Sequence, residues 1–285
     1  MFAITGITGQ VGGHLARRLL ADGQVVRAVL RDPAKAQTWR DSGCEIALAD
    51  IDDPISLGTA FSGADGVFIL LPPTFDPTPG FVEARRSIES IRTALLAAGP
   101  RQVVVLSTIG AQVARPNLLN QLGLLEQALR SLPMPVAFLR AAWFMENSAW
   151  DVEPARSLGV IDSALQPADK PVPMVATIDI AAVAAELLHS TLVGQTVIEL
   201  EGPARVTPDE IAGAFARVLG RSVENRSLPR ATWEALFRSQ GMRHPLARLQ
   251  MLDGFNDGWI EFEGVPRKGT TTIDQVVQAL VTRPD

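Results

Sequence analysis

Tyrosine is absent from the 285-residue sequence, and lysine occurs only at Lys35, Lys170 and Lys268. A mechanism that pairs a tyrosine proton donor with a lysine is therefore excluded by composition. Cysteine occurs once, at Cys44. A single cysteine excludes a disulfide within the chain and is typical of a reducing compartment, so we expect a cytoplasmic location.

Metal-ligating residues and long apolar runs are also scarce. The three histidines, His14, His189 and His244, are scattered, so no metal site is expected. No apolar run reaches about 18 residues without a charge, so no membrane span is predicted. No basic segment precedes the first apolar stretch, so no signal peptide is predicted. The net charge of −5 argues against nucleic acid as a main partner.

The first twenty residues form the most informative segment. The apolar stretch Phe2–Thr5 leads into glycines at Gly6, Gly9 and Gly12 and then into a helical pattern. A strand, a glycine-rich turn and a helix in this order are typical of a dinucleotide site, in which glycines let backbone N–H groups approach a pyrophosphate. Such a turn can also be a plain connector, but its place at the start of the chain favours nucleotide binding. Three apolar residues of the helix share one stripe: Val11, Leu15 and Leu19.

The end of the second apolar stretch bears on the choice of cofactor. A carboxylate in this place usually binds the adenosine ribose and selects NAD. Here Arg31 stands 19 residues after Gly12, and Lys35 follows one helical turn later. A guanidinium suits a 2′-phosphate, so these residues predict NADP. The alternative is a solvated Arg31 beside an Asp32 that caps a helix.

The order of elements predicts the fold class. A hydrophobic fraction of 47 % supplies a core, and the length suggests one large domain or two closely joined domains. Short runs of valine, isoleucine and leucine alternate with helical patterns through Arg140, which predicts a doubly wound parallel Rossmann sheet. We expect residues 1–145 and 176–192 to form this domain. Residues 146–175 and 193–285 are expected to form a smaller, mostly helical substrate lobe.

Several expected elements have clear boundaries. Thr207-Pro208-Asp209-Glu210 is a capping box, with Thr207 as the N-cap of a helix. The predicted strands are 2–5, 24–30, 45–48, 66–71, 102–106, 136–139 and 196–201. The predicted helices before the capping box are those after Gly12, after Pro54, and over 80–98, 118–131 and 179–189. Two further helical stretches are expected near 230–240 and 244–254.

The sequence resembles the NmrA-like family of atypical short-chain dehydrogenase/reductases, nearest to the branch of bacterial quinone reductases and triphenylmethane reductase. The resemblance covers most of the chain. The segments that carry it are Thr5–Gly12, Val29–Pro33, Ala49–Pro54, Ser107-Thr108, Leu139-Arg140 and Phe144–Asn147.

The resemblance implies a set of cofactor and substrate contacts. The position of Arg31 meets the 2′-phosphate, Ser107 lies near the nicotinamide and substrate, and the turn from Trp143 to Asn147 lies near the same place. The implied contacts to the cofactor phosphates and adenosine are Gly6, Thr8, Gly9, Gln10, Val11, Gly12, Asp50, Leu70 and Leu71.

The chain departs from its superfamily at the proton donor. Many NmrA-like proteins carry a lysine or histidine four residues before a helical glutamate; if Glu126 is that glutamate, the position holds Leu122. Two function classes remain. One is an NADPH-dependent reductase of a quinone, azo compound or dye, which needs little acid help. The other is a catalytically silent NADP(H) sensor that acts through a protein partner. The sequence leaves a homodimer open.

Candidate residues for the chemistry have structural alternatives. Ser107 could donate a hydrogen bond to a substrate carbonyl from a strand end, or close a loop. Trp143, Phe144 and Asn147 could line a site for a flat aromatic substrate; for Phe144, as for its neighbour Met145, packing between lobes is the favoured reading. Arg140 ends a strand in an apolar body, which requires a carboxylate or cofactor contact. Glu126 is expected to have a structural role and not to act as a base. The stretch Trp259–Phe262 could pack as a lid on the substrate lobe or form part of the core.

Overall fold

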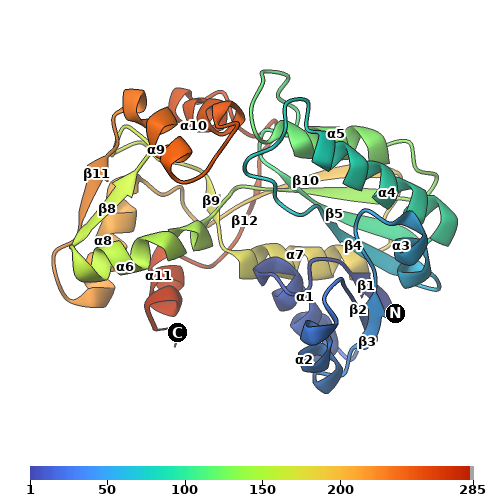
Figure 1. The fold of residues 1–285 in the computed structure, drawn as a ribbon. Helices are drawn as coiled ribbons and strands as arrows, with labels where there is room; N and C mark the ends of the chain where they lie inside the picture. Colours follow the sequence, from blue (N-terminus) through green and yellow to red (C-terminus); the bar gives the residue numbers. More distant parts are fainter. Residues whose placement is uncertain (283–285) are drawn as a thin grey trace.

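A parallel sheet of eight strands forms the centre of the computed structural model, which describes residues 1–282. The strand order is β12-β10-β6-β5-β4-β1-β2-β3, and Figure 1 shows helices on both faces. This confirms the predicted doubly wound Rossmann sheet. The strands are β1 (Phe2–Ile4), β2 (Val26–Leu30), β3 (Glu45–Leu48), β4 (Gly66–Leu70), β5 (Gln102–Thr108), β6 (Val136–Ala141), β10 (Gln195–Glu201) and β12 (Arg267–Lys268).

Two groups of helices cover the faces of the sheet. Helices α1 (Gln10–Ala21) and α7 (Thr177–His189) pack together on one face, and α3 (Pro54–Phe61), α4 (Val82–Ala98) and α5 (Asn120–Leu129) cover the other. Continuous apolar strands such as β5, whose first six residues are buried, suit a sheet that is covered on both sides. The predicted stripe of α1 is buried in the first of the two cores: Val11, Leu15 and Leu19.

The order of the strands places a crevice at the end of β1. The chain runs outward from β1 in both directions, through β2 and β3 on one side and β4, β5 and β6 on the other. In open parallel sheets, ligands bind beside the carboxyl ends of the strands at such a reversal of order. The glycine turn follows β1 directly and therefore lies at this crevice.

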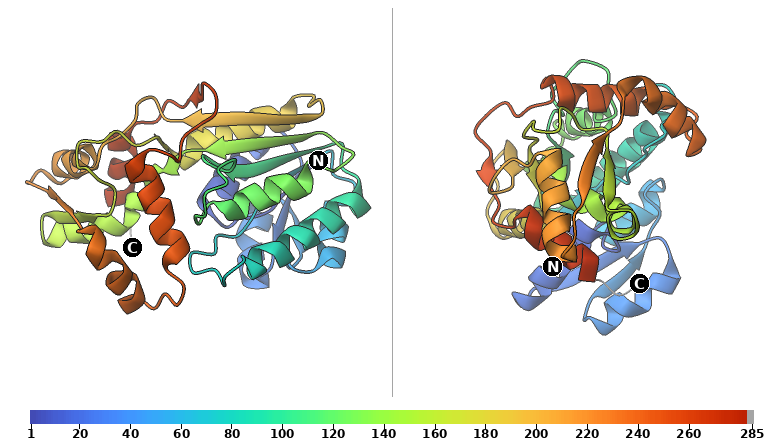
Figure 2. Two further views of the ribbon diagram at one scale, coloured as in Figure 1. Left: turned by 90° about the horizontal axis from the view of Figure 1, so that it is seen from above. Right: turned by 90° about the vertical axis from the view of Figure 1, so that its left-hand side faces the viewer.

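The smaller lobe continues from the carboxyl ends of β6 and β10 (Figures 1 and 2). It has its own core around the fully buried Trp233 and Phe215. Its strands form two small sheets, β7 (Trp143–Phe144) with β9 (Met174–Val175) and β8 (Val160–Ser163) with β11 (Glu224–Ser227). Its helices are α6 (Val152–Ser157), α8 (Pro208–Leu219), α9 (Trp233–Ser239), α10 (Leu246–Asp257) and α11 (Ile273–Thr282), with 3-10 helices η2 (Met145–Asp151) and η3 (Arg230–Thr232).

One predicted boundary needs correction. Residues 193–285 were expected to lie wholly in the smaller lobe, but β10 pairs with β6 along its length and β12 pairs with β10. The two strands belong to the large sheet because β10 completes the hydrogen bonds of the exposed edge of β6. The chain therefore crosses between the lobes more often than the sequence suggested.

Local signals place several elements accurately. Thr207 caps α8 with the predicted reciprocal bonds to Glu210, and Asp53 caps α3 through the N–H groups of Ile55 and Ser56. Within residues 1–282, no helix has both the length and the apolar character needed to cross a bilayer. Helices α11 and α2 (Ala36–Asp41) were not predicted, whereas the 3-10 helix η1 (Pro33–Lys35) begins at Asp32, the helix cap named as an alternative.

Candidate functional site

The glycine turn has the geometry of a phosphate-binding loop. Gly6 has φ +63°, which favours glycine, and a Cβ on Gly12 would lie 2.4 Å from the carbonyl oxygen of Gly6. Helix α1 thus begins in contact with the end of β1. Its N-cap is Gly9, which supplies no capping side chain, and Thr8, Gly9 and Gln10 are exposed. The first N–H groups of the helix are therefore free to meet an anion, so the turn fits a dinucleotide pyrophosphate.

Gly9→Val should abolish cofactor binding while the protein stays folded. The φ of Gly9 is −89°, which valine can adopt, and a Cβ there would meet only the Gly6 carbonyl, at 3.3 Å. The added side chain occupies the surface that phosphates approach. Fluorescence titration with NADPH and circular dichroism check this result. Gly12→Ala is the matched control, since it should lower the free energy of unfolding instead; a folded Gly9→Val variant with normal NADPH affinity would rule out the phosphate loop.

Arg31 lies exposed immediately after β2, with Lys35 at the end of η1. The Asp32 side chain accepts a hydrogen bond from Ala34 N at 2.9 Å. This carboxylate therefore serves as the N-cap of η1. Asp50 lies after β3 and accepts from Asp52 N at 3.0 Å. The end of β2 therefore presents a guanidinium where a carboxylate would select NAD, which fits a 2′-phosphate.

Arg31→Ala should weaken NADPH binding by ~1.5–3 kcal/mol, as expected for a hydrogen bond to a charged group. NADH affinity should change little, because NADH carries no 2′-phosphate. Calorimetric titration of both cofactors measures the difference. Arg40→Ala, which removes an exposed arginine of α2, is the control for a general loss of positive charge. An equal loss for NADPH and NADH would contradict the assignment.

The carboxyl ends of β1 and β4 are joined by Thr5, which the sequence did not single out. Its hydroxyl donates to Phe68 O at 3.0 Å and accepts from Leu70 N at 2.9 Å. This bond holds the side chain of Leu70 against Gly6, where a Cβ would lie 3.1 Å from it. Leu70 thus lies beside the glycine turn. The implied contacts of Leu70 and Leu71 with the adenosine stay a prediction. A threonine at the end of a strand was the only signal that the sequence offered.

A half-buried carboxylate, that of Glu146, connects the turn to the smaller lobe. Glu146 accepts hydrogen bonds from Thr177 N at 2.8 Å and from the Thr177 hydroxyl at 2.6 Å, and that hydroxyl lies 3.4 Å from Gln10 Oε1. Burial raises the pKa of Glu146, against the hydrogen bonds from Thr177. Glu146 therefore joins η2, the start of α7 and the start of α1 at the cofactor crevice. Sequence spacing gave no signal for this contact between residues 31 positions apart.

Ser107 is bound to Glu126 at the end of β5. Both residues are buried, and the Ser107 hydroxyl donates to Glu126 Oε1 at 2.6 Å. Arg140 on β6 donates to the same carboxylate from Nε at 2.9 Å and from Nη2 at 2.8 Å. A hydrogen bond from Ser107 to a substrate carbonyl would require the bond to Glu126 to open. The catalytic role of Ser107 stays a prediction, whereas the bracing role of Glu126 is evident in the geometry.

The same network reaches two other carboxylates. Arg140 donates to Glu263 and lies 3.7 Å from Glu199, and Arg130 donates to Glu126 at 3.0 Å. Burial raises the pKa of Glu126, but the hydrogen bonds from Arg140 and Ser107 and the charge of Arg140 outweigh it and lower the pKa overall. The carboxylate partner expected for a buried Arg140 is therefore present, and it ties β6 to α5 and to the segment after α10.

The predicted substrate residues lie where the lobes meet. Trp143 is half-buried and packs edge-on against Phe255 of α10, with ring centroids 5.2 Å apart. Phe144 is half-buried against the core of the sheet, and Met145 is buried in the core of the smaller lobe. Asn147 is exposed on η2. The packing of Phe144 and Met145 agrees with their interpretation as core between lobes.

The segment after α10 contacts the loop that follows β5. Ile260 is buried, and its side chain lies 2.9 Å from the place that a Cβ on Gly110 would take. The guanidinium of Arg115 lies 4.5 Å from the ring centroid of Trp259, and Gln112 donates to Glu261 O at 2.9 Å. Ile260 thus acts as core, while Trp259 and Glu261 fasten this segment over the end of the sheet.

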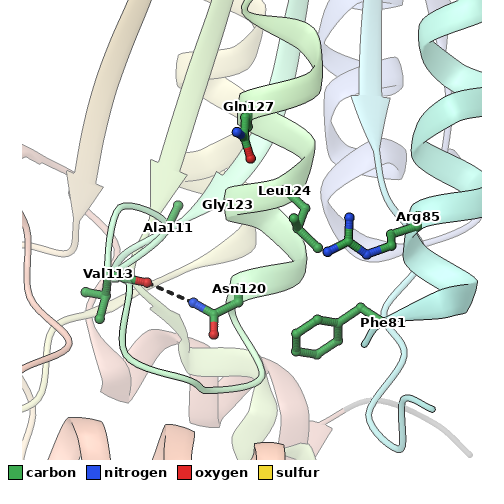
Figure 3. Close-up of a pocket in the computed structure, with 8 residues that line it drawn as sticks. All are labelled: Phe81, Arg85, Ala111, Val113, Asn120, Gly123, Leu124 and Gln127. Atoms are coloured by element: carbon green, nitrogen blue, oxygen red, sulfur yellow. Dashed lines mark hydrogen bonds between the residues drawn. The ribbon is translucent and has the colours of Figure 1, made fainter. Parts of the chain in front are cut away.

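A shallow hollow of about 320 Å3 lies beside this region, between α4 and α5. Figure 3 shows Phe81 and Arg85 on one side and Asn120, Gly123, Leu124 and Gln127 of α5 on the other. Asn120 donates to Val113 O at 2.8 Å, which holds the loop after β5 against α5. The lining does not include Trp143, Phe144 or Asn147, so this hollow is separate from the predicted substrate wall.

The histidines take structural positions. His189 ends α7, where a cation suits the helix dipole, and its ring packs on Phe2 at 5.7 Å. His244 lies just before α10, and its backbone N–H donates to Asp76 at 2.6 Å. Within residues 1–282, no three histidine, cysteine, aspartate or glutamate side chains are grouped as metal ligands.

Comparisons with known proteins bear on the family. The model of the NmrA-like family matches residues 1–276. A reductase of (4-alkanoyl-5-oxo-2,5-dihydrofuran-3-yl)methyl phosphate from Streptomyces griseus is 33% identical over 230 residues, which are 80% of this chain and 77% of the relative.

Solved structures agree on the fold. The NADPH-dependent quinone oxidoreductase of Escherichia coli, in complex with NADPH, superimposes with a TM-score of 0.81 at 24% identity and covers 98% of this chain and 99% of its own. Triphenylmethane reductase of Citrobacter sp., in complex with NADP(H), gives 0.79 at 22% identity and covers 98% and 99%. With its glycine turn, its strand order and a family match over nearly all of its length, the chain belongs to the NmrA-like family.

Proposed function

We propose that this protein is an NADPH-dependent reductase that transfers hydride to a flat, conjugated acceptor such as a quinone, an azo compound or a dye. The observation that carries the proposal is the combination of a dinucleotide turn with a strand end that lacks a free acid. The turn of Gly6, Gly9 and Gly12 leaves the N–H groups of α1 open to phosphates, and Ser107 gives its hydrogen bond to Glu126.

The remaining residues supply no substitute for the missing tyrosine and lysine. Leu122 takes the position of the family's lysine or histidine on α5. Lys35 lies on η1, Lys170 donates to Asn256 O, and Lys268 pairs with Glu201 at the far edge of the sheet. The acceptor must therefore be one that can take a hydride without a proton from a general acid of the protein.

Bound NADPH would supply the hydride. A quinone or azo acceptor spreads the arriving negative charge over several atoms and takes its proton from water. The protein contributes orientation, which can supply ~7–11 kcal/mol of a barrier when the reacting atoms are held in place. Three relatives support such an activity, since their names describe reduction of a butenolide phosphate, a quinone and a triphenylmethane.

Two measurements test the proposal. The first follows the loss of the NADPH absorbance band with a panel of quinones, azo compounds and dyes, and the second is calorimetric titration with NADPH alone. We expect turnover with at least one of these acceptors and tight NADPH binding. Tight binding without turnover of any acceptor would overturn the reductase and favour the NADP(H) sensor instead. Absence of NADPH binding would overturn both.

A further inference from the structure

A second hollow, of about 470 Å3, opens in the smaller lobe between η2, α6, β8 and β11. Figure 1 shows α6, β8 and β11 at the end of the molecule opposite to the N-terminus. Its volume lies in the usual range of small-molecule sites, about 300–1,000 Å3. The lining residues are Trp150, Asp151, Pro154, Leu158, Val160, Asp162 and Arg226. None of these residues contributes to the cofactor crevice.

The charges in this hollow do not balance. Arg226 and Asp162 face each other across the β8–β11 pair and form a two-pronged ion pair, from Nε at 2.5 Å and from Nη2 at 2.8 Å. The ion pair uses the one arginine and one of the two carboxylates. Asp151 is half-buried and makes no side-chain hydrogen bond or ion pair with the described residues. The hollow therefore contains one carboxyl group, that of Asp151, without a cationic partner.

The walls of the hollow are apolar and open to solvent. Trp150 is 68% exposed and Leu158 is 71% exposed, so both side chains are accessible to a ligand. Pro154 and Val160 complete the apolar lining. An indole face attracts cations as well as apolar groups, because its π-electrons are negative. The hollow thus joins an aromatic wall with an unpaired acid.

We propose that this hollow binds a small organic cation: a primary ammonium group that pairs with Asp151, carried on an aromatic or apolar body that packs against Trp150 and Leu158. An inorganic cation would gain nothing from the apolar wall, and a neutral aromatic molecule would leave Asp151 unpaired. An amine with an aromatic body uses both parts of the lining. This site is independent of the proposed reductase activity.

The ionisation of Asp151 gives the proposal a distinctive signature. Burial and the nearby Asp162 raise the pKa of Asp151 to about 7. A bound ammonium group would favour the charged carboxylate, so binding near pH 6 should release a proton. The other charged groups on the elements packed around Asp151 are Glu146 of η2, Glu153 and Arg156 of α6, Asp162 of β8, Glu224 and Arg226 of β11, and Asp274 of α11, which pairs with Arg217.

Calorimetry with 2-phenylethylamine tests the proposal, with 2-phenylethanol as the uncharged probe of the same shape. We expect the amine to bind at least about tenfold more tightly than the alcohol at pH 8, as for one charged hydrogen bond. Titrations at pH 6 in two buffers of different ionisation enthalpy should show proton release, which should vanish at pH 9. Equal affinity for the two probes, or no binding of the amine at millimolar concentration, would overturn the site.

Variants separate this site from general charge effects. Asp151→Asn should remove both the preference for the amine and the proton release, and it should stay folded, since it replaces an unpaired, half-buried acid by a neutral group of the same shape. Glu153→Gln removes an exposed neighbouring acid and should leave both unchanged. Gly9→Val should also keep amine binding, because it affects only the cofactor turn. Amine binding that survives Asp151→Asn would contradict the proposal.

Discussion

Glu126→Ala should lower the free energy of unfolding by ~3–5 kcal/mol, the usual cost of removing one partner of a buried ion pair. The variant leaves the Arg140 guanidinium, whose side chain is 3% exposed, without its two hydrogen bonds to Glu126. It also leaves the buried Ser107 hydroxyl without its acceptor. Glu263 and Glu199 remain near Arg140, but Glu263 is mostly exposed and holds only one of its nitrogen atoms. Equilibrium denaturation with urea measures the loss.

Two further variants make this result specific. Glu89→Ala removes an exposed glutamate that pairs with Arg92 on α4, and it should cost at most ~1 kcal/mol. Glu126→Leu combined with Arg140→Met should recover much of the lost stability, since apolar residues of similar volume can replace a buried pair. A cost below ~1 kcal/mol for Glu126→Ala would show that the network contributes little to stability.

The pKa of Glu126 gives this network a direction of pH dependence. Its pKa is lowered in the folded protein, so the carboxylate contributes stability above its unfolded pKa, and that contribution is lost as the pH falls through the folded value. Glu126→Gln should therefore flatten the acid limb of the curve of stability against pH. The ion pair of Glu126 at the end of β5 thus contributes to the resistance of the sheet to unfolding by acid.

The sequence was most informative where local pattern decides the structure. Continuous apolar runs identified strands such as β5, and Asp53 and Thr207 marked helix starts correctly because capping is a contact between near neighbours. The glycine turn was readable because its role depends on three residues close together in the chain. Helix α2 was missed because it has only six residues, of which two, Ala36 and Trp39, are buried. The cap of η1 by Asp32, in contrast, was the stated alternative for the end of β2.

Contacts between distant segments could not be read from the sequence. The position of Arg140 predicted a carboxylate or cofactor contact, but nothing in the spacing selected Glu126 and Glu263, which lie 14 and 123 positions away. Strand β12 has only two residues, so it gave no pattern, and the placement of β10 depended on pairing with β6. The hydrogen bond between Thr177 and Glu146 beside the glycine turn is likewise visible only in three dimensions.

Reduction of a quinone should exceed reduction of a simple ketone by a wide margin. A simple carbonyl develops alkoxide charge as hydride arrives, and the loss of a positioned acid costs roughly 10²–10⁴-fold. A quinone spreads that charge over its ring and second oxygen, so the same loss affects it less. Leu122 and the bound hydroxyl of Ser107 leave the strand end without such an acid. We expect Arg31 and the glycine turn to act on cofactor binding alone, so changes there should alter both rates by the same factor.

The most direct measurement compares kcat/KM for menadione and for an unactivated aliphatic ketone, with NADPH saturating and both acceptors at matched concentrations. The account predicts rapid oxidation of NADPH with menadione and a kcat/KM for the ketone lower by about 10²-fold or more. Comparable values for the two acceptors would reveal a proton donor in the site and contradict the account.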